Sequence, residues 1–203
     1  MKTEIITINS QGQGMEEALA MTESLGAESG LAEEEKLHLR LLAEELFGML
    51  RSVAGELAAE YWIIKEDRQF ELHMKSEVSL TDEMREQLIS ASTSGENAAG
   101  KGIMGKIRLM IGEVFLSRSS EAVIASGLAM SLMSTASAIG QSTGADAYLW
   151  SLNQYREEVE GSLTKDKGEA WDELEKSIIA KLADEVKVWI VGSSAEITVY
   201  KAF

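Results

Sequence analysis

One stretch of the chain, Gly95 to Lys106, is rich in glycine, has a lysine directly after two of its glycines, and reads GENAAGKGIMGK. Glycine allows a backbone to approach a phosphate closely, and the start of a helix presents unpaired N–H groups to an anion. An apolar pattern with helical spacing, Ile103 to Phe115, begins inside this stretch. The stretch is therefore a candidate phosphate site. Its contacts would come from Gly100, Lys101, Gly102, Gly105 and Lys106.

The same glycines also match two general nucleotide-binding motifs, but the residues or elements that should accompany each motif are missing. Gly95 to Lys101 fits G-x-x-x-x-G-K, but Gly102 follows where a P-loop has the Ser or Thr that meets Mg²⁺. Gly100 to Gly105 fits G-x-G-x-x-G, but it does not follow a strand, as a dinucleotide site requires. A flexible loop that leads into a helix explains these residues without any ligand.

A pair of acidic residues, Glu44 and Glu45, lies within the longest helical pattern, Glu33 to Glu60. Glu45 could serve as a general base, and a solvated helix face is the alternative interpretation. The two histidines, His38 and His73, have no partner at metal-ligand spacing, so we interpret both as ordinary surface or strand residues and expect no metal site.

Composition excludes several classes of partner and site. The formal net charge is -15, which disfavours nucleic acid and anionic membranes. The absence of cysteine excludes disulfides, thiolate metal sites and cysteine nucleophiles. The first residues contain no long apolar run of the kind found in a signal peptide, so a cytoplasmic location is expected.

The order of apolar patterns predicts an α+β fold: a two-layer sandwich whose mixed, mostly antiparallel sheet is covered on one face by helices. A short polar turn, Glu66 to Arg68, separates two strand-like runs and predicts a hairpin. The predicted strands are 3–9, 61–65, 69–75, 186–191 and 195–200. The predicted helices are 15–25, 33–60, 80–91, 103–115, 146–161 and 167–182, with a loop at 92–102.

One long run, Ala122 to Ala145, contains no charged residue. Its length would allow a membrane span, but its Ser, Thr, Gly and Gln content is too polar for one. A buried helix or helical hairpin is the simplest interpretation. Small residues such as Gly127 and Ala138 would also permit close helix approach, so this stretch could form a subunit interface of a homodimer.

Taken together, the opening strand, the long helix with Glu44 and Glu45, the hairpin and the Gly100–Gly105 run resemble the GHKL ATP-binding domains. The similar branch contains anti-sigma-factor serine kinases and histidine-kinase ATPase domains. The glutamate pair resembles the family's N-box, and the glycine run resembles its second glycine box. The resemblance implies three segments: 1–116 as the N-terminal part of the ATP-binding domain, 117–165 as a helical insertion, and 166–203 as the final helix and closing hairpin of the same domain.

Two of the family's motifs are altered. The N-box places an Mg²⁺-binding Asn four residues after a glutamate, whereas Gly48 and Met49 stand four residues after Glu44 and Glu45. Neither side chain offers the oxygen that Mg²⁺ requires. The first glycine box, with its adenine-binding Asp, is missing, and Glu77 or Asp82 would have to replace that Asp.

Three functions remain open at this level. The first is a regulatory ATP-binding-type domain with a degenerate nucleotide site, ATP without Mg²⁺ at most, and a protein partner. The second is an active ATP-dependent serine or histidine kinase-like enzyme, with Glu45 as the base. The third is an oligomerising structural protein that uses residues 117–165.

Overall fold

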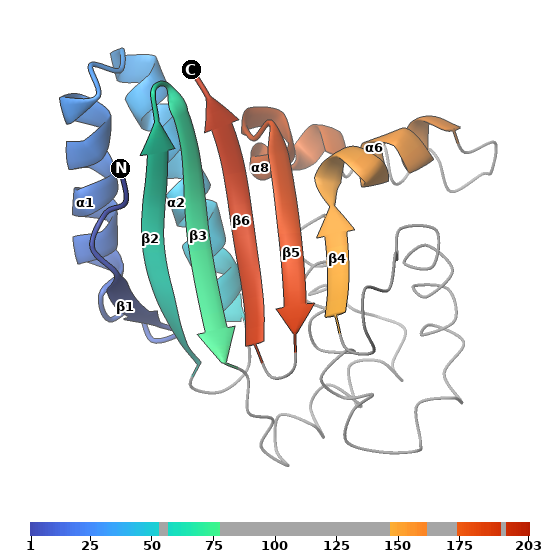
Figure 1. The fold of residues 1–203 in the computed structure, drawn as a ribbon, viewed down its shortest axis with the longest axis horizontal. Coiled ribbons are helices and arrows are strands. Elements are labelled where there is room, and N and C mark those ends of the chain that lie inside the picture. The colour runs from blue at the N-terminus through green and yellow to red at the C-terminus, as the bar shows by residue number, and fades with distance from the viewer. Residues whose placement is uncertain (53–56, 78–146, 162–173, 192–193) are drawn as a thin grey trace.

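The computed structural model describes residues 1–52, 57–77, 147–161, 174–191 and 194–203. These residues form a six-stranded sheet, in the order β1-β2-β3-β6-β5-β4, with helices packed on one face (Figure 1). The strands are β1 (Ile6–Asn9), β2 (Ala58–Glu66), β3 (Gln69–Glu77), β4 (Ala147–Ser151), β5 (Glu185–Val191) and β6 (Ser194–Ala202). The helices are α1 (Met15–Glu28), α2 (Glu33–Ser52), α6 (Leu152–Gly161) and α8 (Ile178–Leu182).

The hairpin of β2 and β3 forms the middle of the sheet together with β6. Glu66 pairs with Gln69 across a two-residue turn, in which Asp67 has a φ of 50°. Aspartate tolerates this left-handed conformation better than most residues, because its short side chain can bond to the local backbone. The predicted hairpin is therefore confirmed, with both strands longer than expected. The closing hairpin of β5 and β6 is confirmed as well.

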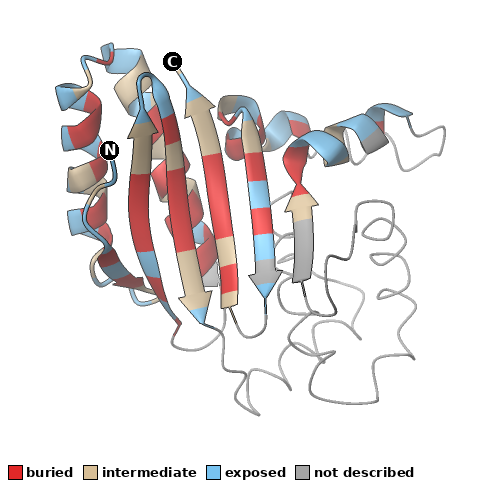
Figure 2. Ribbon diagram, in the orientation of Figure 1, coloured by how far each residue is buried: buried red, intermediate tan, exposed pale blue. Residues whose placement is uncertain are grey.

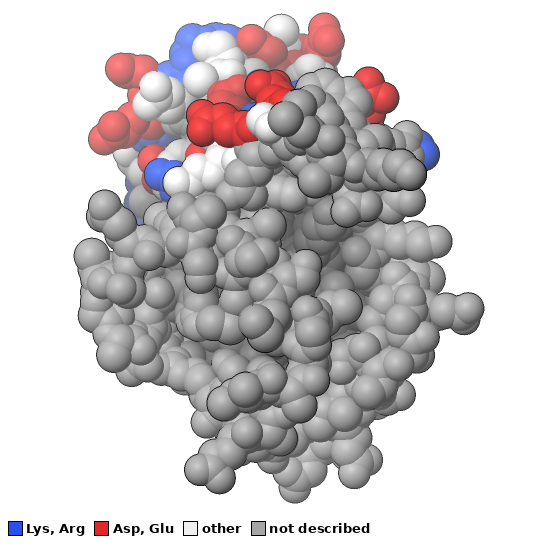
Figure 3. Space-filling view, turned by 90° about the vertical axis from the view of Figure 1, so that its right-hand side faces the viewer, with Lys and Arg blue, Asp and Glu red and all other residues white. Residues whose placement is uncertain are grey.

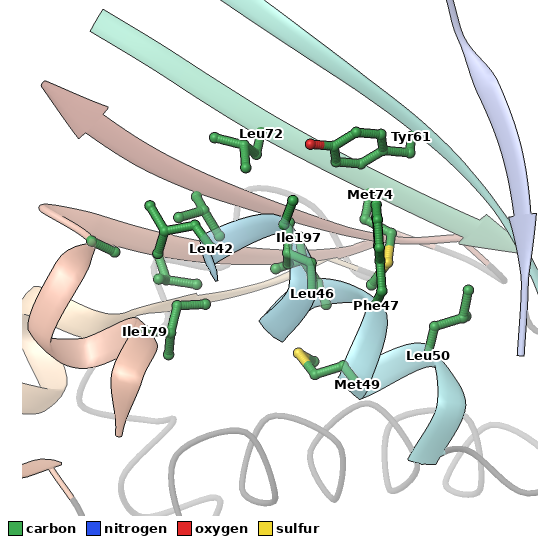
Figure 4. Packing of buried hydrophobic residues seen from close by; sticks show 14 of the residues in the cluster. Leu42, Leu46, Phe47, Met49, Leu50, Tyr61, Leu72, Met74, Ile179 and Ile197 are labelled. Carbon is green, nitrogen blue, oxygen red and sulfur yellow. The ribbon is translucent and has the colours of Figure 1, made fainter. Parts of the chain in front are cut away.

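The hydrophobic core lies between the sheet and the layer of α1 and α2. Phe47 of α2 meets Tyr61 of β2 edge to face, with ring centroids 4.9 Å apart. Figure 4 shows Leu46 and Phe47 beneath the strand residues Tyr61 and Met74. The Tyr61 hydroxyl also lies 3.0 Å from the Thr22 hydroxyl of α1, so one buried side chain ties both helices to the sheet.

The sheet has helices on only one of its faces within the described residues. Side chains alternate along a strand, and β5 shows this most clearly: Val186 and Val188 are buried, whereas Lys187 and Trp189 are exposed (Figure 2). All five pairings between the described strands are antiparallel. The predicted two-layer α+β sandwich is confirmed.

The long helix predicted over residues 33–60 is too long. The helix α2 ends at Ser52, and strand β2 begins at Ala58. Residues 58–61 pair with β1 on one side, and residues 59–66 pair with β3 on the other. Two ladders of backbone hydrogen bonds therefore outweigh the local helical preference of this alanine- and glutamate-rich segment.

The helix predicted over 146–161 is also wrong in its first part. Residues 147–151 form β4, an edge strand paired with β5, and only Leu152–Gly161 are helical. Trp150 favours a strand because aromatic side chains pack well on a pleated surface. The last part of the expected helical insertion 117–165 therefore contains a strand of the sheet.

The helix predicted over 167–182 is interrupted within its described part, 174–182. Ser177 leaves the helical conformation and its hydroxyl accepts a hydrogen bond from the backbone N–H of Ala180, so it caps a new helix, α8. The restart changes which residues face the core. Ile179 is fully buried, whereas Ile178, four residues after the buried Leu174, is 41% exposed.

Several expectations lie outside the described residues: the helices at 80–91 and 103–115, the loop at 92–102 and the charge-free run at 122–145. In the described part of the chain, no helix is both long enough and apolar enough to cross a membrane. Acidic side chains gather on the described surface seen in Figure 3, in keeping with the net charge of -15.

The connection from β1 to α1 provides a test of the fold. Gly14 has a φ of +75°, and a Cβ at this position would overlap the carbonyl oxygen of Thr7. Gly30 has a similar φ of +68°, but a Cβ there would meet nothing within 4 Å. We expect Gly30→Ala to cost about 1–2 kcal/mol of stability for the left-handed backbone alone. Gly14→Ala should cost clearly more in urea unfolding, and equal costs would contradict the close approach of Gly14 to β1.

Candidate functional site

The predicted catalytic residue, Glu45, follows Glu44 on α2, so the helical period turns it away from the side of the helix that carries Arg40 and Glu44. The α1 side of α2 is marked by Arg40, which bonds to Glu23 of α1 and, at 2.8 Å, to Glu44. Glu45 is half-buried, and burial together with the charge of Glu44 raises the pKa of its carboxyl group. A carboxyl group that holds its proton more readily is a better general base near neutral pH. Glu45 thus has one property that the predicted role requires.

The positions that should hold a magnesium ligand do not provide one. Met49 is only 6% exposed and belongs to the hydrophobic core. Gly48 is exposed, and a Cβ added there would meet nothing within 4 Å. The flank beside Glu45 therefore offers space at Gly48 but no side-chain oxygen one turn after either glutamate.

Of the predicted site residues, the structure describes only Glu45 and Glu77. Glu77 is the last residue of β3 and continues the alternation of His73 and Lys75, which lie on the face opposite α2. Glu45 and Glu77 are thus on opposite sides of the sheet. The other predicted contacts, Gly100, Lys101, Gly102, Gly105 and Lys106, lie outside the described residues, as does Asp82.

A cluster that sequence reasoning missed surrounds His73 on the face of the sheet opposite α1 and α2. Among the described residues no helix covers this face, which we call the bare face (Figure 1). The imidazole ring stacks on Trp62, with ring centroids 4.9 Å apart and an angle of 7° between the planes. Its Nδ1 lies 3.0 Å from Glu196 Oε1 and 3.2 Å from Thr198 Oγ1, and its Nε2 lies 3.2 Å from Glu71 Oε2. Of the two predicted settings, surface or strand, His73 lies in the strand, and it is buried there at 8% exposure.

Tyr200 of β6 lies next to this cluster and pairs with Glu71 of the neighbouring strand β3. Burial raises the pKa of the Tyr200 hydroxyl, and the nearby charges of Glu71, Glu185 and Glu196 raise it further. The ammonium group of Lys187 lies 5.1 Å from the centroid of the Tyr200 ring. The surroundings of Tyr200 are therefore strongly negative, and a lysine partly compensates them.

The contacts of Glu71 and Glu196 hold the His73 ring in place but do not form a metal centre. Glu71 and Glu196 contact opposite nitrogens of His73, so their carboxylates do not converge on a common point. Within the described residues, no three His, Asp or Glu side chains are placed to hold a metal ion. The strand alternation in the sequence could have assigned these side chains to one face, but only the register of β3 and β6 brings them together.

A second feature that sequence reasoning missed is a shallow cavity at the start of α1, about 570 Å³ in volume. It is lined by residues 11–17, Leu19 and Arg51. Glycines separated by one residue, between a strand and a helix, are the signal that could have indicated it. Glu16 and Glu17 already place negative charge at the helix start, and the Arg51 Nε–H donates to the sulfur of Met15 at 3.2 Å. The two glutamates at the helix start oppose the positive charge of Arg51, so the cavity is poorly suited to a phosphate.

Comparison with known proteins provides no relative from which a role could be transferred. No protein-family model, no curated protein and no solved structure matches the chain.

The raised pKa of Glu45 makes stability depend on pH in a defined direction. A carboxyl group whose pKa is higher in the folded protein than in the unfolded chain contributes stability at low pH, and this is lost as pH rises through the folded value. The stability of Glu45→Gln, measured relative to the unaltered protein, should therefore increase as pH rises from about 4 to about 7. Urea unfolding at both pH values measures this gain. Glu34→Gln, an exposed change on the same helix, is the control, and an equal gain in both variants would contradict the burial of Glu45.

Proposed function

We propose that this protein is a regulatory domain of the GHKL ATP-binding type in which the nucleotide site is degenerate and the main activity is binding of a protein partner. The observation that carries the proposal is the burial of Met49 in the core. The residue that should bind Mg²⁺ through oxygen instead contributes a thioether to the packing of α2.

The order of the described elements supports the resemblance on which this proposal rests. An opening strand, two helices and a hairpin are followed, after the intervening segments, by a closing hairpin that pairs with β3. The glutamate pair is on α2, as the resemblance requires. Glu45 remains partly buried, which is compatible with a pocket beside α2.

The same geometry argues against an active magnesium-dependent kinase. Such an enzyme needs Mg²⁺ to neutralise the charge that develops on the phosphates, and hard oxygen ligands to hold the ion. Gly48 and Met49 provide none, and Glu77 lies on the other side of the sheet from Glu45. A fold that keeps its core and loses these ligands is best suited to a binding function.

Titration calorimetry with ATP tests the proposal. We expect no binding, or binding only at millimolar ATP, with no change when Mg²⁺ is added. Micromolar binding that requires Mg²⁺ and falls in Lys101→Ala would overturn the degenerate site and establish the kinase-like alternative.

A matched pair of variants tests whether α2 borders a nucleotide pocket at all. Gly48→Asn introduces an amide oxygen four residues after Glu44, in a position where a side chain has room. Gly48→Ala removes the same helix glycine, worth about 1 kcal/mol, without adding the oxygen. A gain of Mg²⁺-dependent ATP binding in Gly48→Asn alone would assign the pocket to this flank. No gain in either variant would exclude α2 from it.

A further inference from the structure

The bare face of the sheet has a marked excess of negative charge. By strand register, it carries six glutamates and two lysines from β2, β3, β5 and β6, and Lys2 near the N-terminus adds a third lysine. The glutamates are Glu60, Glu66, Glu71, Glu77, Glu185 and Glu196, and the strand lysines are Lys75 and Lys187. A surface of this composition attracts cations and cationic side chains.

The protein itself places cations on aromatic rings of this face in two places. The ammonium group of Lys2 lies 4.7 Å from the centroid of the Trp62 ring, and that of Lys187 lies 5.1 Å from the Tyr200 ring. Both distances fall within the range of an attractive cation–π contact. The aromatic groups of the face are thus suited to receive ammonium or guanidinium groups.

A third aromatic ring lies on this face, and no cation of the described residues contacts it. Trp189 of β5 is 42% exposed, and among the described residues no lysine or arginine lies over its ring. Trp189 pairs with Glu196 of the neighbouring strand β6. Glu196 uses Oε1 to contact His73, whereas Oε2 makes no hydrogen bond within the described part of the chain. An exposed indole and an available carboxylate oxygen are therefore neighbours.

An exposed apolar residue lies beside Trp189 on the same strand. Val191 lies two residues after Trp189, on the same face, and is 45% exposed. Residues two apart on an extended chain point to the same side, so a bound strand could place a cation at Trp189 and an apolar side chain at Val191. A single small cation would leave Val191 uncovered.

We propose that the bare face of the sheet docks a basic, extended segment of a partner protein, whose arginine or lysine lies on Trp189 and pairs with Glu196. This inference rests on the proposed protein-binding function and names the surface and the chemistry of the partner. The charge of the face excludes nucleic acid and anionic membrane as occupants. The His73 cluster holds Glu196 in position, because Nδ1 fixes one of its two carboxylate oxygens.

The probe for the experiment is a synthetic peptide that alternates arginine and valine, and the matched control peptide carries citrulline, which is uncharged and of similar shape, in place of arginine. Titration into the intact protein, labelled with ¹⁵N, is followed by NMR. We expect the indole N–H signal of Trp189 to shift with the arginine peptide and to stay in place with the citrulline peptide. Binding should weaken as salt is raised, because exposed ion pairs are screened.

Two matched pairs of variants separate a specific site from general attraction to an acidic protein. Trp189→Ala should weaken binding roughly five- to tenfold, as expected for loss of a cation–π contact and its apolar area. Leu37→Ala, at a 53% exposed position on α2, should leave binding unchanged. Glu196→Gln should weaken binding roughly threefold, whereas Glu34→Gln, which removes the same charge from α2, should not.

Equal binding of the two peptides, or equal losses within either pair of variants, would overturn the assignment of this face. The result is independent of the ATP titration. If the peptide fails to bind and ATP also shows no Mg²⁺-dependent binding, the docking surface is wrong while the degenerate site stands. If the peptide binds as expected and ATP binds with Mg²⁺ at micromolar concentration, the surface stands and the proposed function is wrong.

Discussion

The packing of α2 against the middle of the sheet is the contact on which the rest of the structure depends. Leu42, Leu46 and Phe47 are buried against strand residues such as Tyr61 and Leu72, all at 2% exposure or less. Burial of apolar area on this scale is the main favourable term in folding. It also determines which residues of α2 remain available for chemistry, because each side chain in the core is withdrawn from any site.

This packing affects the position at which the GHKL resemblance expects a Mg²⁺ ligand. Met49 is in the core because the helical period places it there with Leu46 and Leu50. An oxygen ligand at this position would have to be buried among apolar groups, at a cost of roughly 1–3 kcal/mol if it lacked a partner. The stability of the fold and the binding of Mg²⁺ therefore make opposite demands on one residue, and the packing of the core prevails.

The opposite face of the sheet is subject to different forces. Strand alternation sends Trp62, His73 and Thr198 away from the helices, yet each is less than 10% exposed. Neighbouring strands cover them through stacking and hydrogen bonds, with Glu71 and Glu196 at the two nitrogens of His73. This produces a centre of buried, hydrogen-bonded side chains between two glutamates, with more exposed side chains such as Trp189 around it. Such a centre can position side chains for recognition with little loss of conformational freedom on binding.

The sequence by itself determined the class of fold, the two hairpins and the start of both long helices, because alternation and helical spacing are local properties of the chain. It also determined that Gly48 and Met49 cannot bind Mg²⁺, which follows from residue type alone. Only the tertiary structure decided that residues 58–60 and 147–151 are strands, because their backbone groups find partners on distant strands. It also decided that Glu45 and Glu77 lie apart and that Glu71, His73 and Glu196 meet, since these neighbours depend on the register of strands more than 100 residues apart in sequence.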